Sequence, residues 1–243
     1  MPERLNQTWV YLSASPLFWL TMTLVAYQLA FRIYQRSGQR PLANPVLLSI
    51  LILVSLLTVT GTPYVRYFEG AQFVHFLLGP ATVALAIPLY GQFKRLTRMA
   101  APLVLALLGG SLTAMLSAVF VGYWFGGSLP TLLSLAPKSV TTPIAMGIAE
   151  QIGGLPSLAA VMVIATGILG AMAAQMLYRW LGIRDDAVAG FSMGVAAHGI
   201  GTARAFQLSE TMGAFAALGM GLNGLLTALA LPGLMSWIKP WLQ

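Results

Sequence analysis

Long apolar stretches separated by short clusters of charge are the feature that most limits how this chain can fold. Only 8% of its residues are charged, whereas 58% are hydrophobic. A soluble domain carries about 25% charged residues. A chain so poor in charge cannot cover itself with a solvated surface. The sequence therefore predicts an all-α polytopic membrane protein that lies in a lipid bilayer.

The basic residues lie at the ends of the apolar segments. They give a net charge of +7. In a soluble protein this charge would suggest a nucleic-acid partner. Here we expect no nucleic-acid partner, because Lys and Arg in the loops of a membrane protein set its orientation. The clusters Arg32–Arg40 and Lys94–Arg98 are two crossings apart, so both are expected in the cytoplasm. The amino terminus is then outside, and it lacks the residue order of a signal peptide.

A membrane-spanning helix needs about 20 mostly apolar residues. We expect a single domain over residues 1–243 with about 6–8 membrane segments, some of them broken or re-entrant helices. Thr62–Gln72 is expected to be an outer loop. The expected apolar segments are Leu17–Tyr34, Val46–Thr60, Phe73–Tyr90, Leu103–Phe125, Ser157–Tyr178, Val188–Phe206 and Gly213–Ile238.

The stretch Ala136–Glu150 interrupts this apolar pattern. Pro137 and Pro143 each remove a backbone donor and disfavour a continuous helix. Lys138 is costly at membrane depth and should face protein or water. If Arg179 and the residues after it are cytoplasmic, the stretch must re-enter and leave on the outer side. A loop of low polarity outside the membrane is the alternative.

A weak internal repeat supports a broken helix. Leu78–Val83 and Leu135–Val140 share a proline, a small hydroxyl residue and a valine in register. Corresponding broken segments in two halves of a chain are typical of transporters with inverted repeats. The sequence thus suggests an inverted repeat, although apolar composition can also produce such a match by chance.

Two cations, Lys138 and Arg204, fall within or beside the broken segments. Arg204 can hold a small carboxylate through its planar guanidinium, and Lys138 can act as a point charge. Alternatively, the two cations form structural ion pairs with Glu150 and Glu210. The hydroxyl and glycine residues expected to complete an anion-binding site are Thr82, Ser139, Thr141, Thr142, Gly199, Gly201 and Thr202.

His198 titrates near neutral pH and is a candidate for proton coupling, as is Glu150. A histidine packed between small residues is the other interpretation, and His75 has a weaker claim to any role. Gly219–Gly224 has the spacing of a dinucleotide fingerprint but follows no strand, so close helix packing explains it better. Gly190–Gly194 is available for close contact with another membrane helix in a homo- or hetero-oligomer, although such glycines also pack helices within one chain.

The sequence offers no support for catalysis. It has no nucleophile elbow of the G-x-S-x-G kind, and Lys138 and Ser139 are adjacent, so they would not face each other on a helix. Cysteine is absent, which excludes disulfides and thiolate metal sites. We therefore expect no enzyme, no cofactor and no metal.

Three segments, Leu78–Gln92, Ala136–Met146 and Ala196–Ala205, resemble the LrgB/CidB family. That family includes YohK-like proteins of the bacterial inner membrane and the carboxy-terminal half of the plastidal glycolate/glycerate translocator. The resemblance implies a small LrgA/CidA-type membrane partner. It also implies one of two functions, which are transport of small monocarboxylates such as pyruvate, glycolate or glycerate, and antiholin-like regulation of murein hydrolase export and cell lysis.

Overall fold

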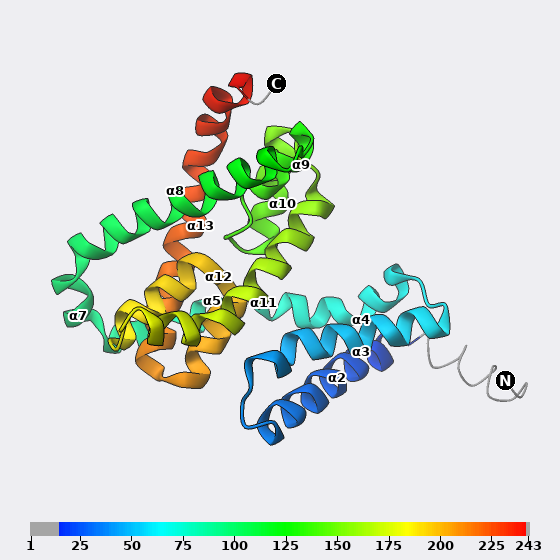
Figure 1. Ribbon diagram of the computed structural model, residues 1–243. Coiled ribbons are helices and arrows are strands. Elements are labelled where there is room, and N and C mark those ends of the chain that lie inside the picture. Colours follow the sequence, from blue (N-terminus) through cyan, green and yellow to red (C-terminus); the bar gives the residue numbers. More distant parts are fainter. Residues whose placement is uncertain (1–14, 242–243) are drawn as a thin grey trace, which may run out of the picture. The chain divides into compact units, whose positions relative to one another are not determined.

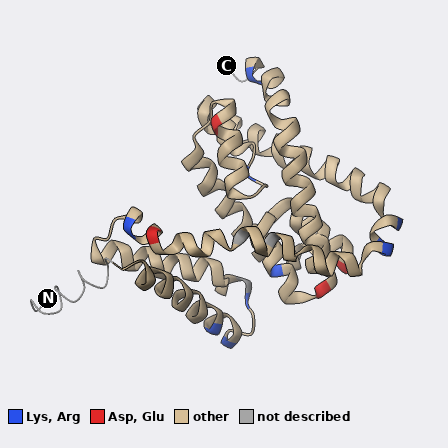
Figure 2. Ribbon diagram, turned by 180° about the vertical axis from the view of Figure 1, so that it is seen from behind, with Lys and Arg blue, Asp and Glu red and all other residues tan. Residues whose placement is uncertain are grey.

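The computed structural model describes residues 15–241, except for the side chains of Pro41, Leu78 and Thr82. The described residues form helices and no strands, which confirms the all-α class (Figure 1). Five helical stretches are long and apolar enough to cross a membrane, and Pro45–Thr60 is a shorter apolar helix. Charged residues gather at helix ends and leave most helical ribbon uncharged (Figure 2). The chain is thus a multi-pass membrane protein.

The chain divides into two compact units, residues 1–84 and 85–243; the single domain expected over 1–243 stays a prediction. In unit 1, Gly70 of α4 lies against the backbone of α2 at Pro16 and Leu20. The Trp19 ring is fully buried and meets Tyr67 edge to face, 5.9 Å between centroids. The helices are α2 (Pro16–Arg36), η1 (Pro41–Ala43), α3 (Pro45–Thr60), α4 (Tyr64–Phe76) and α5 (Leu78–Ala84).

Unit 1 corrects two sequence-based expectations. The expected outer loop Thr62–Gln72 is wrong, because most of it is helix α4, and the contact of Gly70 with α2 stabilises that helix. The expected segment Phe73–Tyr90 is divided among three short helices. Leu78–Val83 is helical, whereas its proposed repeat partner Leu135–Val140 ends in turns, so the two stretches differ in backbone conformation.

Unit 2 is built on three long unbroken helices, α8, α11 and α13. Their apolar side chains form the main buried clusters, one of which joins Met115, Leu132 and Leu231. Each long helix matches an expected span to within a few residues. The helices are α6 (Ala86–Gly91), α7 (Phe93–Arg98), α8 (Ala100–Trp124), α9 (Leu129–Leu135), α10 (Thr142–Ile152), α11 (Pro156–Trp180), α12 (Asp186–Leu208), α13 (Glu210–Ile238) and η2 (Lys239–Trp241).

The first broken segment is a hairpin made of α9 and α10, separated by turns over residues 136–141. Its return end lies beside its entry arm, because the backbone N–H of Leu155 donates to Ser134 Oγ at 2.7 Å. Gly153 ends α10 with a φ of 90° and faces Lys239, so we call this end of unit 2 the Lys239 end. The broken helix expected from the sequence is confirmed as a hairpin, whereas its entry into the membrane from the outer side stays a prediction.

The second hairpin is α12, which reverses at His198 (φ 41°, ψ −133°). The hydroxyl of Ser209, just after α12, donates to the carboxylate of Asp186, the first residue of α12, at 2.6 Å. The start of the first arm therefore lies beside the end of the second arm. The helix therefore restarts near Gly199–Gly201, after the break at His198. The segment returns to the end it came from. That end also holds Arg95, paired with Asp185, and we call it the Arg95 end.

Glycines let the first arm of α12 pack tightly on α13. A Cβ on Gly190 would collide with the backbone of Met212, and one on Gly194 with that of Ala216. Gly219 of α13 meets the backbone of Phe191 in the same way. The packing role expected for Gly219 is confirmed. The contact with another chain expected for Gly190–Gly194 is wrong at these two glycines, since α13 of the same chain already covers them.

Candidate functional site

The two hairpins enter unit 2 from opposite ends, and their tips are joined by one amide, Asn223 of α13. Its Nδ2 donates to the carbonyl of Ser139 in the first tip and to that of Val195 near the second, each at 3.0 Å. Its Oδ1 accepts from the Ser111 hydroxyl of α8. Asn223 is 1% exposed and lies near the middle of α13. The broken backbone is therefore held at half height within the unit.

His198 forms the second tip and rests on α11. Its Nε2 lies 2.9 Å from the carbonyl of Val163, and because a carbonyl only accepts, Nε2 carries a hydrogen. Gly167 leaves room for the ring, since a Cβ there would lie 2.7 Å from His198 Cε1. The Thr202 hydroxyl donates to the His198 carbonyl at 2.8 Å. The His198 carbonyl freed by the break is thus paired within the second arm, as a buried backbone acceptor requires.

Lys138 lies in the first tip, between the two helices of its hairpin. Its ammonium donates to the Ser139 hydroxyl at 3.2 Å, and the Asn223 amide links Ser139 to Val195, three residues before His198. Thr141 and Thr142 begin α10, where backbone N–H groups and the helix dipole favour an anion. The structure therefore brings a cation, a histidine, hydroxyls and a helix start together around the two tips.

Arg204 lies on the second arm of α12, about 9 Å along the helix from His198. It is 7% exposed, and its guanidinium donates to Gln207 and, across to α11, to Gln175, at 3.1 Å each. Gly201 lets this arm approach the first, because a Cβ there would lie 2.9 Å from the Met193 carbonyl. A Cβ on Gly199, next to His198, would be in ordinary contact with the sulfur of Met220, 3.9 Å away. Arg204 therefore lies between the tips and the Arg95 end.

Several candidates lie elsewhere. Thr82 lies in α5 of unit 1, and its side chain is outside the described residues. Glu150 is exposed on α10 and forms no ion pair with Lys138 in the described chain, so that structural pairing is wrong. His75 is exposed on α4, with its ring 6.3 Å from that of Phe68.

Asn223 was not among the sequence-predicted site residues. It is an amide in the middle of an apolar helix, and a polar residue at membrane depth is costly unless it is paired. The glycine-rich stretch Gly219–Gly224 directed attention to packing and away from the amide within it. The sequence feature that could have identified the site is the single amide side chain of Asn223 within an apolar helix.

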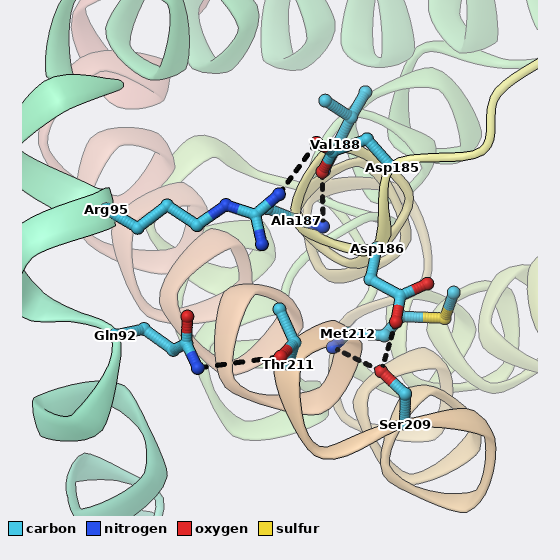
Figure 3. A network of polar contacts seen from close by, with 9 residues as sticks. All are labelled: Gln92, Arg95, Asp185, Asp186, Ala187, Val188, Ser209, Thr211 and Met212. Carbon is cyan, nitrogen blue, oxygen red and sulfur yellow. Dashed lines mark hydrogen bonds and ion pairs between the residues drawn. The ribbon is translucent and has the colours of Figure 1, made fainter.

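At the Arg95 end, a network of polar contacts joins the start of α12 to α7 and to the residue between α12 and α13 (Figure 3). Arg95 pairs with Asp185 at 2.7 Å, and Gln92 donates to Thr211 of α13 at 3.5 Å. Slight burial acts to raise the pKa of the Asp185 carboxyl. The N–H groups of Val188 and Ala187 and the Arg95 charge outweigh this effect and hold that pKa below its ordinary value. The network stabilises both arms of the second hairpin at their base.

Two re-entrant helices that meet at mid-height among three long apolar helices define a multi-pass membrane protein with a central polar site. The chain matches the LrgB-like family over residues 23–237. It therefore belongs to that family, as its motifs suggested. No solved structure matches it.

Curated relatives cover nearly the whole chain. It is 38% identical to the uncharacterized protein YwbG of Bacillus subtilis, over 90% of this chain and 97% of that protein. It is 28% identical to a holin-like protein CidB of Staphylococcus epidermidis, over 89% of this chain and 94% of that one. The holin-like protein CidB of Staphylococcus aureus is 26% identical, over 90% and 95% of the two chains. These relatives and the five apolar helices indicate that the chain is a multi-pass bacterial membrane protein.

Proposed function

We propose that this protein transports small monocarboxylates, such as pyruvate, glycolate or glycerate, across the bacterial membrane. The observation that carries the proposal is the meeting of two broken hairpins at Asn223, with Lys138 and His198 at their tips. A static scaffold has little need for broken helices and a cation at mid-membrane depth. A carrier needs both, because its site must face each side in turn.

Each site residue has a role in this proposal. Lys138 supplies a point charge to the carboxylate, and Arg204 supplies a planar pair of donors nearer the Arg95 end. His198 carries a coupling proton, and Glu150 at the Lys239 end of α10 is a second candidate for coupling. The groups that donate hydrogen bonds to substrate oxygens are Ser139, Thr141, Thr142 and the backbone at Gly199 and Gly201. Thr202 joins them when its hydroxyl turns away from the His198 carbonyl.

The test is uptake of radiolabelled pyruvate and glycolate into proteoliposomes, with and without a small LrgA/CidA-type partner. A hydrogen bond to a charged group is worth about 1.5–3 kcal/mol, so Lys138→Ala and Arg204→Ala should each weaken substrate binding about ten- to a hundredfold. Arg204→Lys keeps the charge but loses the planar fork, so it should also impair uptake. The control is Lys94→Ala, which removes an exposed cation outside the hairpins. Correctly inserted variants that transport at the wild-type rate would contradict the site assignment.

The second candidate function is antiholin-like regulation of murein hydrolase export and lysis. It is favoured by one observation, the name holin-like given to the staphylococcal relatives. A regulator should depend on the glycine contacts that hold its helices and on its partner. A carrier should depend on Lys138 and Arg204 even when insertion and partner binding are normal. Measuring both lysis and uptake for the same variants separates the two functions.

A further inference from the structure

The Arg95 end of unit 2 contains a cavity of about 440 Å³ between the end of α11 and the two ends of α12. Gln175, Arg179 and Arg184 line it, together with Asp186. The Asp186 carboxylate already accepts the Ser209 hydroxyl at 2.6 Å (Figure 3). Two arginines against one engaged carboxylate leave the cavity with an excess of positive charge. Its charge suits a small anion.

Gln175 connects this cavity to Arg204. Its side chain lines the cavity, and its Oε1 accepts from Arg204 Nη2 at 3.1 Å. The amide oxygen of a cavity-lining residue thus accepts a hydrogen bond from one guanidinium nitrogen of Arg204. Arg204 is buried, and it contacts the cavity lining through Gln175, so an anion in the cavity meets this amide beside the guanidinium.

We propose that this cavity is the entry site for substrate carboxylates, and that Gln175 is a displaceable ligand that occupies Arg204 until a carboxylate replaces it. The inference rests on the proposed transport function and deepens it. A carboxylate oxygen forms a stronger, charge-assisted hydrogen bond with guanidinium than an amide oxygen does. The exchange therefore favours an entering monocarboxylate over the amide. The strength of the Gln175–Arg204 hydrogen bond sets how tightly the monocarboxylate must bind to replace the amide.

The test uses the absence of native cysteine. Ile183→Cys places one thiol in the cavity, and its labelling by an impermeant maleimide is followed in inside-out vesicles with increasing pyruvate. Pyruvate should slow labelling at least threefold. Gln175→Glu puts a permanent carboxylate beside Arg204, so it should abolish this protection and reduce pyruvate uptake tenfold or more. Gln175→Leu removes the competing oxygen, so pyruvate should protect at a concentration at least threefold lower.

Gln151→Glu is the matched control, because it adds the same charge at an exposed position near the Lys239 end; it should preserve both protection and uptake. If the wild type takes up pyruvate while Gln175→Glu keeps protection and uptake within twofold, this inference is wrong and the transport function stands. If the wild type takes up neither pyruvate nor glycolate, with or without the small partner, both proposals are wrong. Protection that Gln175→Leu shifts to higher pyruvate concentrations would also overturn the displaceable-ligand role.

Discussion

At the scale of single residues, Asn223 links more elements of unit 2 than the Arg95–Asp185 ion pair does. One amide joins both hairpin tips to α8 and α13, and its partners are backbone carbonyls and hydroxyls. Those partners are at membrane depth, where an unmade hydrogen bond has no water to replace it. Loss of this amide therefore leaves several buried groups unsatisfied at once.

We expect Asn223→Ala to destabilise the protein clearly. Each buried acceptor left unsatisfied costs about 1–3 kcal/mol, and at about 2–4 °C per kcal/mol the apparent Tm should fall by about 4 °C or more. Thermal unfolding in detergent, followed by fluorescence, measures the change. Ser236→Ala on the exposed face of α13 is the control, because its hydroxyl makes only a local bond. Equal Tm values for the two variants would contradict the role of Asn223.

His198 offers a second test, because its φ of 41° is a conformation that favours glycine. In an ordinary helix Gly is about 1 kcal/mol less stable than Ala. At position 198 the order should be reversed, with His198→Gly unfolding at a higher temperature than His198→Ala. Ala203, exposed in the second arm of α12, is the control, and Ala203→Gly should be destabilising. A His198→Ala variant as stable as His198→Gly would argue against strain at the tip.

At the scale of elements, the base of α12 depends on an exposed ion pair. Arg95 and Asp185 have side chains that are 40% and 47% exposed, so solvent screening keeps their contribution small. The pKa of Asp185 is lowered in the folded protein. The pair and its hydrogen bonds therefore stabilise the fold at pH values above the ordinary Asp pKa of 3.8. That stability is lost as the pH falls through the depressed pKa.

We therefore expect Asp185→Asn to lose less stability than the wild type when the pH falls from about 5 to about 3. The expected difference is a small shift in apparent Tm, measured in detergent at each pH. Glu69→Gln, an exposed carboxylate in unit 1, should follow the wild type. If Asp185→Asn and the wild type lose stability in parallel, the Asp185 contacts do not contribute in this pH range.

The sequence predicted the long helices well and the hairpins in part. Apolar length and flanking charge located α8, α11 and α13, because membrane spans depend on composition more than on tertiary contacts. Prolines marked the first tip. The second tip has none, and its reversal depends on the contacts of His198 with α11, which no local pattern reveals. The α4 helix was missed because its stability depends on the contact between Gly70 and α2.

At the scale of the whole molecule, charge sets the orientation. Arg95 and Asp185 pair at one end of unit 2, and Lys239 lies near Gly153 at the other. Arg179 and Arg184, which follow or end α11, also lie at the Arg95 end, beside Asp186. Short loops rich in Lys and Arg stay in the cytoplasm. The Arg95 end and the loop after α2, with Arg36 and Arg40, should therefore both be cytoplasmic.

Single cysteines test this orientation cleanly, because the natural chain has none. Gln39→Cys in the loop after α2 and Leu181→Cys at the Arg95 end should react with an impermeant reagent only after the membrane is opened. Ser128→Cys, at the turn before α9, should react in intact cells, because the predicted orientation places the entry of the first hairpin on the outer side. Since all three positions lie in loops or at helix ends, differences in labelling report the side of the membrane rather than burial. Labelling of Gln39→Cys in intact cells would overturn the orientation, and matching reactivity of Ser128→Cys and Leu181→Cys would contradict the placement of the two hairpins on opposite sides.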